Sequence, residues 1–127
     1  MNSVNSAVRS TTAAQIHWQE TPWIQVCSLD DLAPDTGLCA LIHQQQIALF
    51  YSSRLNEVFA IGNYDPIGKA NVLSRGIIGS IGAAVVVASP LYKQHFDLRT
   101  GACLEAPEHR AAVYPVRIVD GMIQVQA

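Results

Sequence analysis

The sequence predicts an all-β domain folded as a small antiparallel β sandwich or barrel. Three observations predict this fold class. The apolar runs are short, about the length of a strand, and turn-forming residues separate them. The pair Asp120-Gly121 stands between two apolar runs, which is typical of a tight hairpin. The sequence contains neither a long amphipathic helix nor an internal repeat.

The first half of the chain is expected to alternate strands with short connections. In order these are an extended segment at 18–27, a capped turn at 28–32, a loop at 34–37, a hairpin made of 38–42 and 46–51 around residues 43–45, a polar connection at 52–56 and a strand at 57–61. In the capped turn, the Ser28 side chain is expected to accept a hydrogen bond from the backbone of Asp30 or Asp31.

The second half begins with a glycine-rich segment, 68–82. Its apolar residues recur neither every two residues, as in a strand, nor every 3.6 residues, as in a helix. We therefore expect an irregular connection there, with one short strand or turn. The sequence of residues 83–88 predicts a strand buried on both faces, because all six residues are apolar and no polar residue alternates with them. The remaining elements are a short strand leading to a turn at 99–101, a brief pairing at 100–104, a polar loop at 105–112 and a hairpin made of 114–119 and 122–125.

The composition indicates one domain whose surface is partly covered by a partner. A length of 127 residues suits a single domain. Residues 1–17, rich in Ser, Thr, Asn and Ala, are expected to form a flexible N-terminal extension, and residues 18–127 the β domain. Hydrophobic residues make up 50% of the chain and charged residues only 14%, against an average charged fraction of about 25%. A surface this poor in charge favours a protein partner.

Several classes of partner and location are disfavoured. The net charge of −2 and the scattered basic residues argue against nucleic acid. No apolar run reaches the roughly 18 residues of a membrane span, and residues 1–16 lack the apolar core of a signal peptide. Cys27, Cys39 and Cys103 are odd in number and far apart, so we expect free buried thiols in a reducing compartment, the cytoplasm.

Two segments resemble the ligand loops of a Rieske iron–sulfur domain. The segment Ser89-Pro90-Leu91-Tyr92, followed by Phe96-Asp97 and Thr100-Gly101, is similar to the second loop, Cys-Pro-Leu-His with Phe-Asp-x-x-Thr-Gly after it. Residues 59–66 resemble the first loop, in which Cys-x-His follows a strand. Asn63 and Ser89 stand at the cysteine positions, and Asp65 and Tyr92 stand at the histidine positions.

These four replacements remove the chemistry of the cluster. A Rieske cluster is held by two thiolates on one iron and two imidazoles on the other, and oxygen or amide groups do not match sulfide-bridged iron in softness. The resemblance therefore implies a Rieske-like domain, with two projecting loops, that lacks its cluster ligands.

Within the Rieske superfamily, the chain is similar to the small subunits of cytoplasmic NAD(P)H-dependent assimilatory nitrite reductases. The segments that carry this resemblance are 35–41, 65–66, 72–76 and 88–91. The resemblance extends from about residue 23 to residue 125. It implies an accessory, non-catalytic subunit of an enzyme that reduces nitrite to ammonium in nitrate assimilation. It also implies a large catalytic partner subunit that holds FAD, an iron–sulfur cluster and siroheme, and no cofactor or metal in this chain.

Without a cluster, the two loops must be held by packing and hydrogen bonds, and prolines at both tips lower the entropy lost on ordering. We expect the tips to adjoin at one end of the domain, with Asn63, Asp65 and Ser89 able to hydrogen-bond across the gap. The candidate docking residues for the large subunit are the apolar and aromatic ones at the tips: Tyr64, Ile67, Leu91 and Tyr92. The rival docking surface is the glycine-rich segment 68–82.

Two other functions are considered, a Rieske-type electron carrier and an unrelated β module that binds a small molecule. The four replaced ligands argue against the carrier. Ser89, His95 and Asp97 are the residue types of a hydrolytic triad, but the sequence has no nucleophile elbow, so no catalytic residue is predicted. The four histidines are dispersed and no Cys-x-x-Cys pair accompanies them, so no metal site is predicted.

Overall fold

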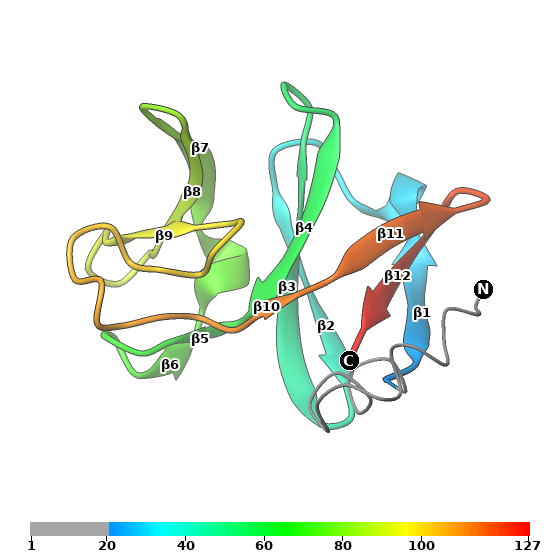
Figure 1. Cartoon of the computed structure of the whole chain (residues 1–127), viewed down its shortest axis with the longest axis horizontal. Coiled ribbons are helices and arrows are strands. Elements are labelled where there is room, and N and C mark those ends of the chain that lie inside the picture. Colours follow the sequence, from blue (N-terminus) through cyan, green and yellow to red (C-terminus); the bar gives the residue numbers. More distant parts are fainter. Residues whose placement is uncertain (1–20) are drawn as a thin grey trace, which may run out of the picture.

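The computed structural model describes residues 21–127, which form three layers of antiparallel β-sheet (Figure 1). The central layer is a four-stranded sheet of order β10-β4-β3-β2. A sheet of order β1-β12-β11 packs on one of its faces, and a sheet of order β7-β8-β9 packs on the other. A two-stranded ribbon, β5-β6, lies beside the second of these outer sheets. The predicted all-β antiparallel class is confirmed, with open sheets and no closed barrel among residues 21–127.

The elements are short throughout. The bounds are β1 Trp23–Ser28, η1 Leu29–Asp31, β2 Gly37–Ile42, β3 Gln45–Ser52, β4 Glu57–Gly62, β5 Tyr64–Asp65, β6 Ala70–Asn71, η2 Leu73–Arg75, β7 Ile77–Ile81, β8 Ala84–Ala88, β9 His95–Asp97, β10 Val113–Tyr114, β11 Val116–Val119 and β12 Met122–Gln126, where η marks a single 3₁₀ turn.

Side-chain alternation along β3 explains why the central sheet is covered on both faces. Successive residues of a strand point to opposite faces of the sheet. Ala48 and Phe50 pack in one core with Val87 of β8, whereas Leu49 packs in the other core with Ile123 of β12. All five side chains are fully buried. The middle of β3, residues 47–50, therefore needs apolar residues at every position, and its sequence there is Ile-Ala-Leu-Phe.

The predicted turns of the first half are present. The Ser28 hydroxyl accepts a hydrogen bond from the backbone nitrogen of Asp30 at 3.2 Å and caps the 3₁₀ turn η1. The hairpin β2-β3 also forms, but its loop is two residues long and not three, because Gln45 already pairs with Ile42. His43 and Gln44 have positive φ angles of 51° and 66°, as both central residues of a type I′ turn must have.

The glycine-rich segment contains more structure than the one short strand or turn expected, because it holds β6, the 3₁₀ turn η2 and β7. Its second half forms a full strand, β7, which pairs with β8 along its whole length. The sequence of β7 does not show the alternation of apolar and polar residues typical of a strand, because β7 is an edge strand with one glycine and mostly exposed side chains. Ile78 packs on the core, whereas Ile77 and Ile81 are exposed although they are apolar. Its partner β8 matches the prediction, with Val85–Val87 buried.

The hairpin β11-β12 turns at Asp120-Gly121, as predicted, with Val119 opposite Met122. Asp120 has a φ of 52° and Gly121 a φ of 76°, which is the type I′ geometry.

Replacing Gly121 with valine should destabilise the domain by about 2 kcal/mol, because a β-branched residue is strained at a positive φ. The space around Gly121 is open, with no atom within 4 Å of the position that a Cβ would take, so backbone strain is the only cause expected. Thermal unfolding measures the loss. An unchanged melting temperature would contradict the turn assignment.

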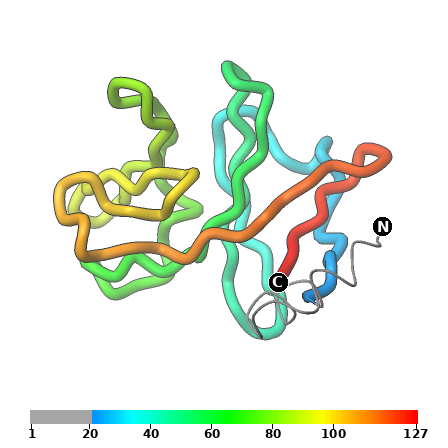
Figure 2. The backbone as a smooth tube through the Cα atoms, in the orientation of Figure 1, coloured from blue at the N-terminus to red at the C-terminus, as the bar shows by residue number. Residues whose placement is uncertain are grey.

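The two ends of the described chain lie side by side (Figure 2). The backbone nitrogen of Ala127 donates to the carbonyl of Pro22 at 3.3 Å, and the Gln126 side chain donates to the carbonyl of Thr21 at 3.0 Å. The predicted flexible extension, residues 1–17, lies outside the described residues. No helix in the described part of the chain is long and apolar enough to cross a membrane.

The three cysteines are free, as predicted, but only one is buried. Cys103 is buried, Cys27 is half-buried and Cys39 is exposed. The expected burial of Cys39 is therefore wrong, although its neighbours in the chain are apolar. It lies opposite Ala48 and therefore on the same face of the central sheet, but β2 is the edge strand, and the side chain stays exposed there.

Candidate functional site

The first loop, defined here as Asn63–Lys69, is carried by the end of β4. Within it, Asp65 is fully buried, and its Oδ1 atom accepts hydrogen bonds from the backbone nitrogens of Ile67 at 2.8 Å and Gly68 at 3.0 Å. A further hydrogen bond, from the Lys69 backbone nitrogen to the Asp65 carbonyl at 2.7 Å, closes the loop. An aspartate that binds its own downstream backbone is a common device for a tight turn. Asp65 therefore organises this loop.

The second loop, defined as Ser89–His95, joins β8 to β9. The Lys93 backbone nitrogen donates to the Ser89 carbonyl at 3.0 Å, and the Ser89 nitrogen donates to the Gln94 carbonyl at 2.9 Å. The Ser89 side chain is fully buried. The second loop thus turns around Ser89 as the first turns around Asp65.

A direct hydrogen bond joins the two loops. The Ser89 hydroxyl donates to Asp65 Oδ2 at 2.5 Å, and neither residue is exposed to solvent. A hydrogen bond to a charged group in a buried setting is among the stronger ones. Two positions at which a Rieske domain would bind iron are here bonded to each other.

Asn63 does not take part in this contact between the loops. Its Oδ1 atom accepts from the backbone nitrogen of Ser74 at 2.6 Å, and its Nδ2 atom donates to Gln46 Oε1 at 2.9 Å. It is nearly fully buried. Asn63 therefore ties the start of the first loop to β3 and to the 3₁₀ turn η2, a contact that the sequence did not predict.

The fourth ligand position, Tyr92, has 65% of its surface exposed, whereas the other three positions are buried. Tyr64 and Leu91 are exposed as well, at 48% and 44%. The fourth candidate docking residue, Ile67, is partly buried against the core between the central sheet and the β7-β8-β9 sheet. The side chains available at the tips are therefore Tyr64, Leu91 and Tyr92.

The tips of the two loops adjoin. A Cβ placed on Gly68 would lie 2.5 Å from Leu91 Cδ1 and 3.0 Å from Asp65 Oδ2, so glycine is needed there for Leu91 to pack across the first loop. We call the exposed end that results the two-loop surface, and define it by Tyr64, Lys69, Leu91, Tyr92 and Lys93.

The donor set of the two loops does not fit a Rieske cluster. A carboxylate, an amide, a hydroxyl and an outward-pointing phenol occupy the four positions, whereas the cluster needs two thiolates and two imidazoles. The three buried side chains among them already make hydrogen bonds. Asn63 bonds Ser74 and Gln46, and Asp65 bonds the backbone of its own loop and Ser89. Among residues 21–127, no group of three or more metal-ligating side chains is present.

The residue types of a hydrolytic triad are not brought together. Ser89 donates to Asp65, the His95 ring contacts Glu105 Oε2 at 2.6 Å, and Asp97 accepts from backbone nitrogens of its own turn. The hydrogen bond from the His95 backbone nitrogen, together with the ring contact, holds the pKa of Glu105 below its ordinary value. These contacts fix the start of β9 and the turn after it.

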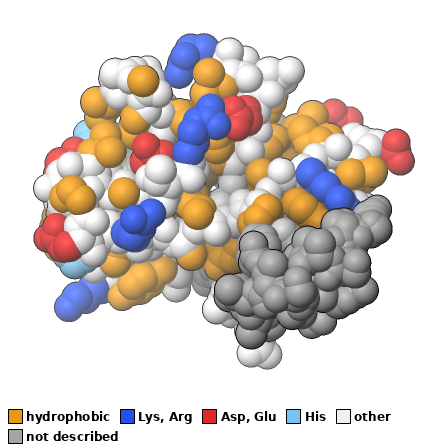
Figure 3. Space-filling model, in the orientation of Figure 1, with side chains coloured by type: hydrophobic (Ala, Val, Ile, Leu, Met, Phe, Trp, Pro, Cys, Tyr) orange, Lys and Arg blue, Asp and Glu red, His pale blue; other side chains and the backbone are white. Residues whose placement is uncertain are grey.

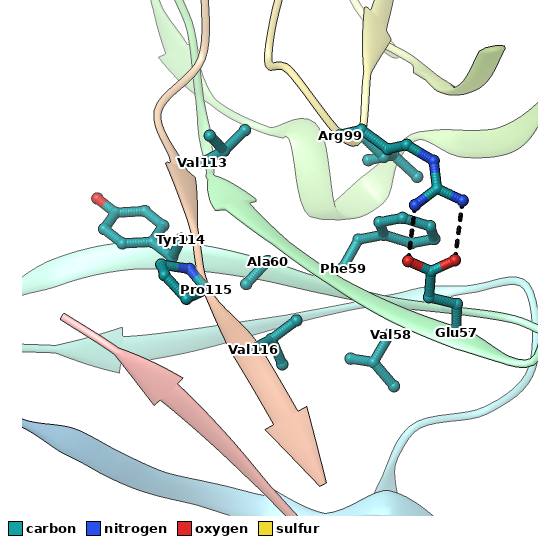
Figure 4. Close-up of a pocket in the computed structure, with 10 residues that line it drawn as sticks. Glu57, Val58, Phe59, Ala60, Arg99, Val113, Tyr114, Pro115 and Val116 are labelled. Carbon is teal, nitrogen blue, oxygen red and sulfur yellow. Dashed lines mark hydrogen bonds and ion pairs between the residues drawn. The ribbon is translucent and has the colours of Figure 1, made fainter. Parts of the chain in front are cut away.

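One cavity that the sequence did not indicate is a groove of about 420 Å³ between β4 and the segment 113–116 (Figure 4). Arg99 and Glu57 lie at one end, joined by two hydrogen bonds of 2.7 and 2.8 Å, and the Arg99 guanidinium lies 5.2 Å from the centre of the Phe59 ring. The charged groups of this groove thus satisfy one another. A small-molecule site would lack a free charge to orient its ligand here.

Comparison with known proteins points to one family. Residues 22–126 match the family described as Rieske-like [2Fe-2S] domain. The chain is 41% identical over 104 residues to the nitrite reductase (NADH) small subunit of Escherichia coli K12. These 104 residues cover 82% of this chain and 96% of that protein. The solution structure of the Escherichia coli protein NirD superposes with a TM-score of 0.77 at 40% identity, covering 84% of this chain and 96% of that one.

A further relative contains the same domain within a longer chain. The nitrite reductase [NAD(P)H] large subunit of Klebsiella oxytoca is 38% identical to this chain over 104 residues, which cover 82% of this chain and 11% of that protein.

Proposed function

Since this chain belongs to the Rieske-like domain family and, within it, to the small subunits of NADH-dependent nitrite reductases, we propose that it is a cluster-free accessory subunit that binds the large catalytic subunit. The observation that carries the proposal is the direct Ser89–Asp65 hydrogen bond, which joins the two loops where a Rieske domain would hold its cluster.

The proposal separates the roles of the two subunits. The small subunit contributes no iron and no reacting group, and electron transfer from the nicotinamide to nitrite takes place in the large subunit, on the FAD, iron–sulfur cluster and siroheme that the family resemblance implies. The reaction would serve nitrate assimilation, in the cytoplasm. Three free cysteines agree with a reducing compartment.

The association with the large subunit is supported by the Klebsiella oxytoca protein, in which a homologous domain forms part of the large-subunit chain. A domain that occurs both as a separate chain and inside its partner is expected to pack against that partner. We take residues 18–127 as the domain that does so. This leaves residues 1–17 outside it.

The docking face that we propose is the two-loop surface. Tyr64, Leu91 and Tyr92 expose large apolar or aromatic groups at its centre, and such groups carry most of the binding energy when an interface covers them. Hydrogen bonds already hold the loops beneath them, so these loops would lose little entropy on binding. The rival face is the glycine-rich segment 68–82, in which Ile77 of β7 is 78% exposed.

Co-purification tests the proposed function. The tagged chain should bring down the large subunit from cells grown on nitrate, and the complex should show the absorption of siroheme. The same chain passed through a lysate of cells that lack the large subunit should elute alone and colourless. Failure to retain the large subunit, with the tagged chain folded, would contradict the proposal.

A further inference from the structure

The two loops are built on one five-residue pattern. Asp65-Pro66-Ile67-Gly68-Lys69 and Ser89-Pro90-Leu91-Tyr92-Lys93 share a hydrogen-bonding first residue, a proline second, an aliphatic third and a lysine fifth. In each, the fifth backbone nitrogen donates to the first carbonyl, and the third backbone nitrogen donates to the first side chain, at 2.8 Å in the first loop and 3.4 Å in the second. The first side chains of the two patterns then bond to each other.

The shared pattern ends each loop on a lysine held in an unusual conformation. Lys69 has a φ of 58° and Lys93 a φ of 64°, the left-handed region that costs an ordinary residue roughly 1–2 kcal/mol. Glycine or asparagine would fit these positions better. Both side chains are exposed, and these are the two lysines of the chain.

The two-loop surface is therefore positive on a chain whose net charge is −2. The one carboxylate within residues 63–71 and 89–94 is Asp65, which is fully buried. The carboxylates that follow in the chain are Asp97 on β9, which accepts from the backbone of its own turn, and Glu105 and Glu108 in the connection after β9. Glu105 is engaged by His95. Figure 3 shows basic and apolar side chains at the end of the molecule where β5 and β6 lie, with acidic side chains along the neighbouring edge.

We infer that the surface of the large subunit that receives the two-loop surface is acidic, with carboxylates placed around an apolar site for Leu91 and Tyr92. Apolar side chains at the centre of an interface and charges at its rim are the usual arrangement. Rim charges of opposite sign steer the encounter and fix the register of the two proteins. This inference rests on the proposed docking of the two-loop surface and adds the chemistry of the partner.

Charge reversal tests the inference. Binding of the purified large subunit is measured at about 50 mM and about 300 mM salt, because screening weakens contacts between exposed charges. The wild-type chain should bind less tightly at the higher salt. The double variant Lys69→Glu, Lys93→Glu should bind about tenfold more weakly at the lower salt, mostly through a slower association rate, and should lose most of the salt dependence.

Two controls keep the result interpretable. Arg54→Glu reverses an exposed basic residue in the β3-β4 turn, outside the two-loop surface, and should bind as the wild type does. The neutral variant Lys69→Gln, Lys93→Gln should fall between the wild type and the charge reversal. Circular dichroism and thermal unfolding show that each variant is folded.

The outcomes distinguish the inference from the docking proposal. A folded charge-reversal variant that binds with wild-type affinity and salt dependence overturns the acidic partner surface. If Leu91→Asp still weakens binding strongly in that case, docking at the two-loop surface stands. If Leu91→Asp also binds normally, the docking site itself is wrong. Tighter binding of the charge-reversal variant would show that the partner surface is basic, which also overturns the inference.

Discussion

Replacing Ser89 with alanine should lower the free energy of unfolding by about 3 kcal/mol, the largest effect we expect from a single atom in this chain. The substitution removes the hydroxyl that donates to Asp65 Oδ2 and leaves that oxygen buried without its partner. Leaving a buried acceptor without a hydrogen bond lowers the stability of the folded protein by about 1–3 kcal/mol, and by more when the acceptor is charged. Urea denaturation followed by circular dichroism measures the change.

A second serine–aspartate pair provides a matched control. The Ser53 hydroxyl donates to Asp35 Oδ2 at 2.7 Å, but both residues are exposed. Water can replace the lost hydroxyl there, so Ser53→Ala should cost much less than Ser89→Ala. The two variants remove the same atom from the same kind of pair. Equal stability losses in both, or no loss in Ser89→Ala, would show that the bond between the loops does not hold them together.

Replacing Leu91 with aspartate should weaken binding to the large subunit by at least about 30-fold, the loss of roughly 2 kcal/mol expected at an interface hot spot. The substitution puts a charge at the centre of the two-loop surface, beside Gly68 of the other loop. Tyr92→Ala removes the neighbouring aromatic ring, which is 65% exposed in the free chain, and should weaken binding as well. Isothermal titration with the purified large subunit gives both affinities.

Ile77→Asp is the control for this measurement, because Ile77 is more exposed than Leu91 and lies on the rival surface, β7. We expect it to leave affinity unchanged. The opposite pattern, in which Ile77→Asp loses binding and Leu91→Asp keeps it, would move the docking site to the glycine-rich segment.

Local sequence was sufficient to predict most of the fold. Asp120-Gly121 forms the predicted turn because the conformation it needs is available to that dipeptide, and Ser28 caps its turn through a partner two residues away. A short strand or turn was expected within residues 68–82, but the position of β7 was not predicted, because β7 is an edge strand of small and apolar residues whose alternation is visible only once β8 is paired with it.

The candidate site was only partly predictable, because its contacts join distant segments. The sequence placed Asp65 and Ser89 at two ligand positions, but they are 24 residues apart, and only the folded chain shows that they bond. It grouped Asn63 with them, whereas Asn63 bonds Ser74 and Gln46. The repeated pattern that ends at Lys69 and Lys93 is legible in the sequence. Its significance depends on the two loops lying side by side.

The iron and acid-labile sulfide content of the purified chain tests most directly the claim that hydrogen bonds have taken the place of the cluster. The chain should be expressed with ample iron, purified without the large subunit and analysed together with its visible absorption spectrum. We expect no stoichiometric iron or sulfide and no visible absorption band, since Asn63, Asp65, Ser89 and Tyr92 provide neither thiolate nor imidazole. About two irons and two sulfides per chain, the content of a Rieske cluster, would contradict it.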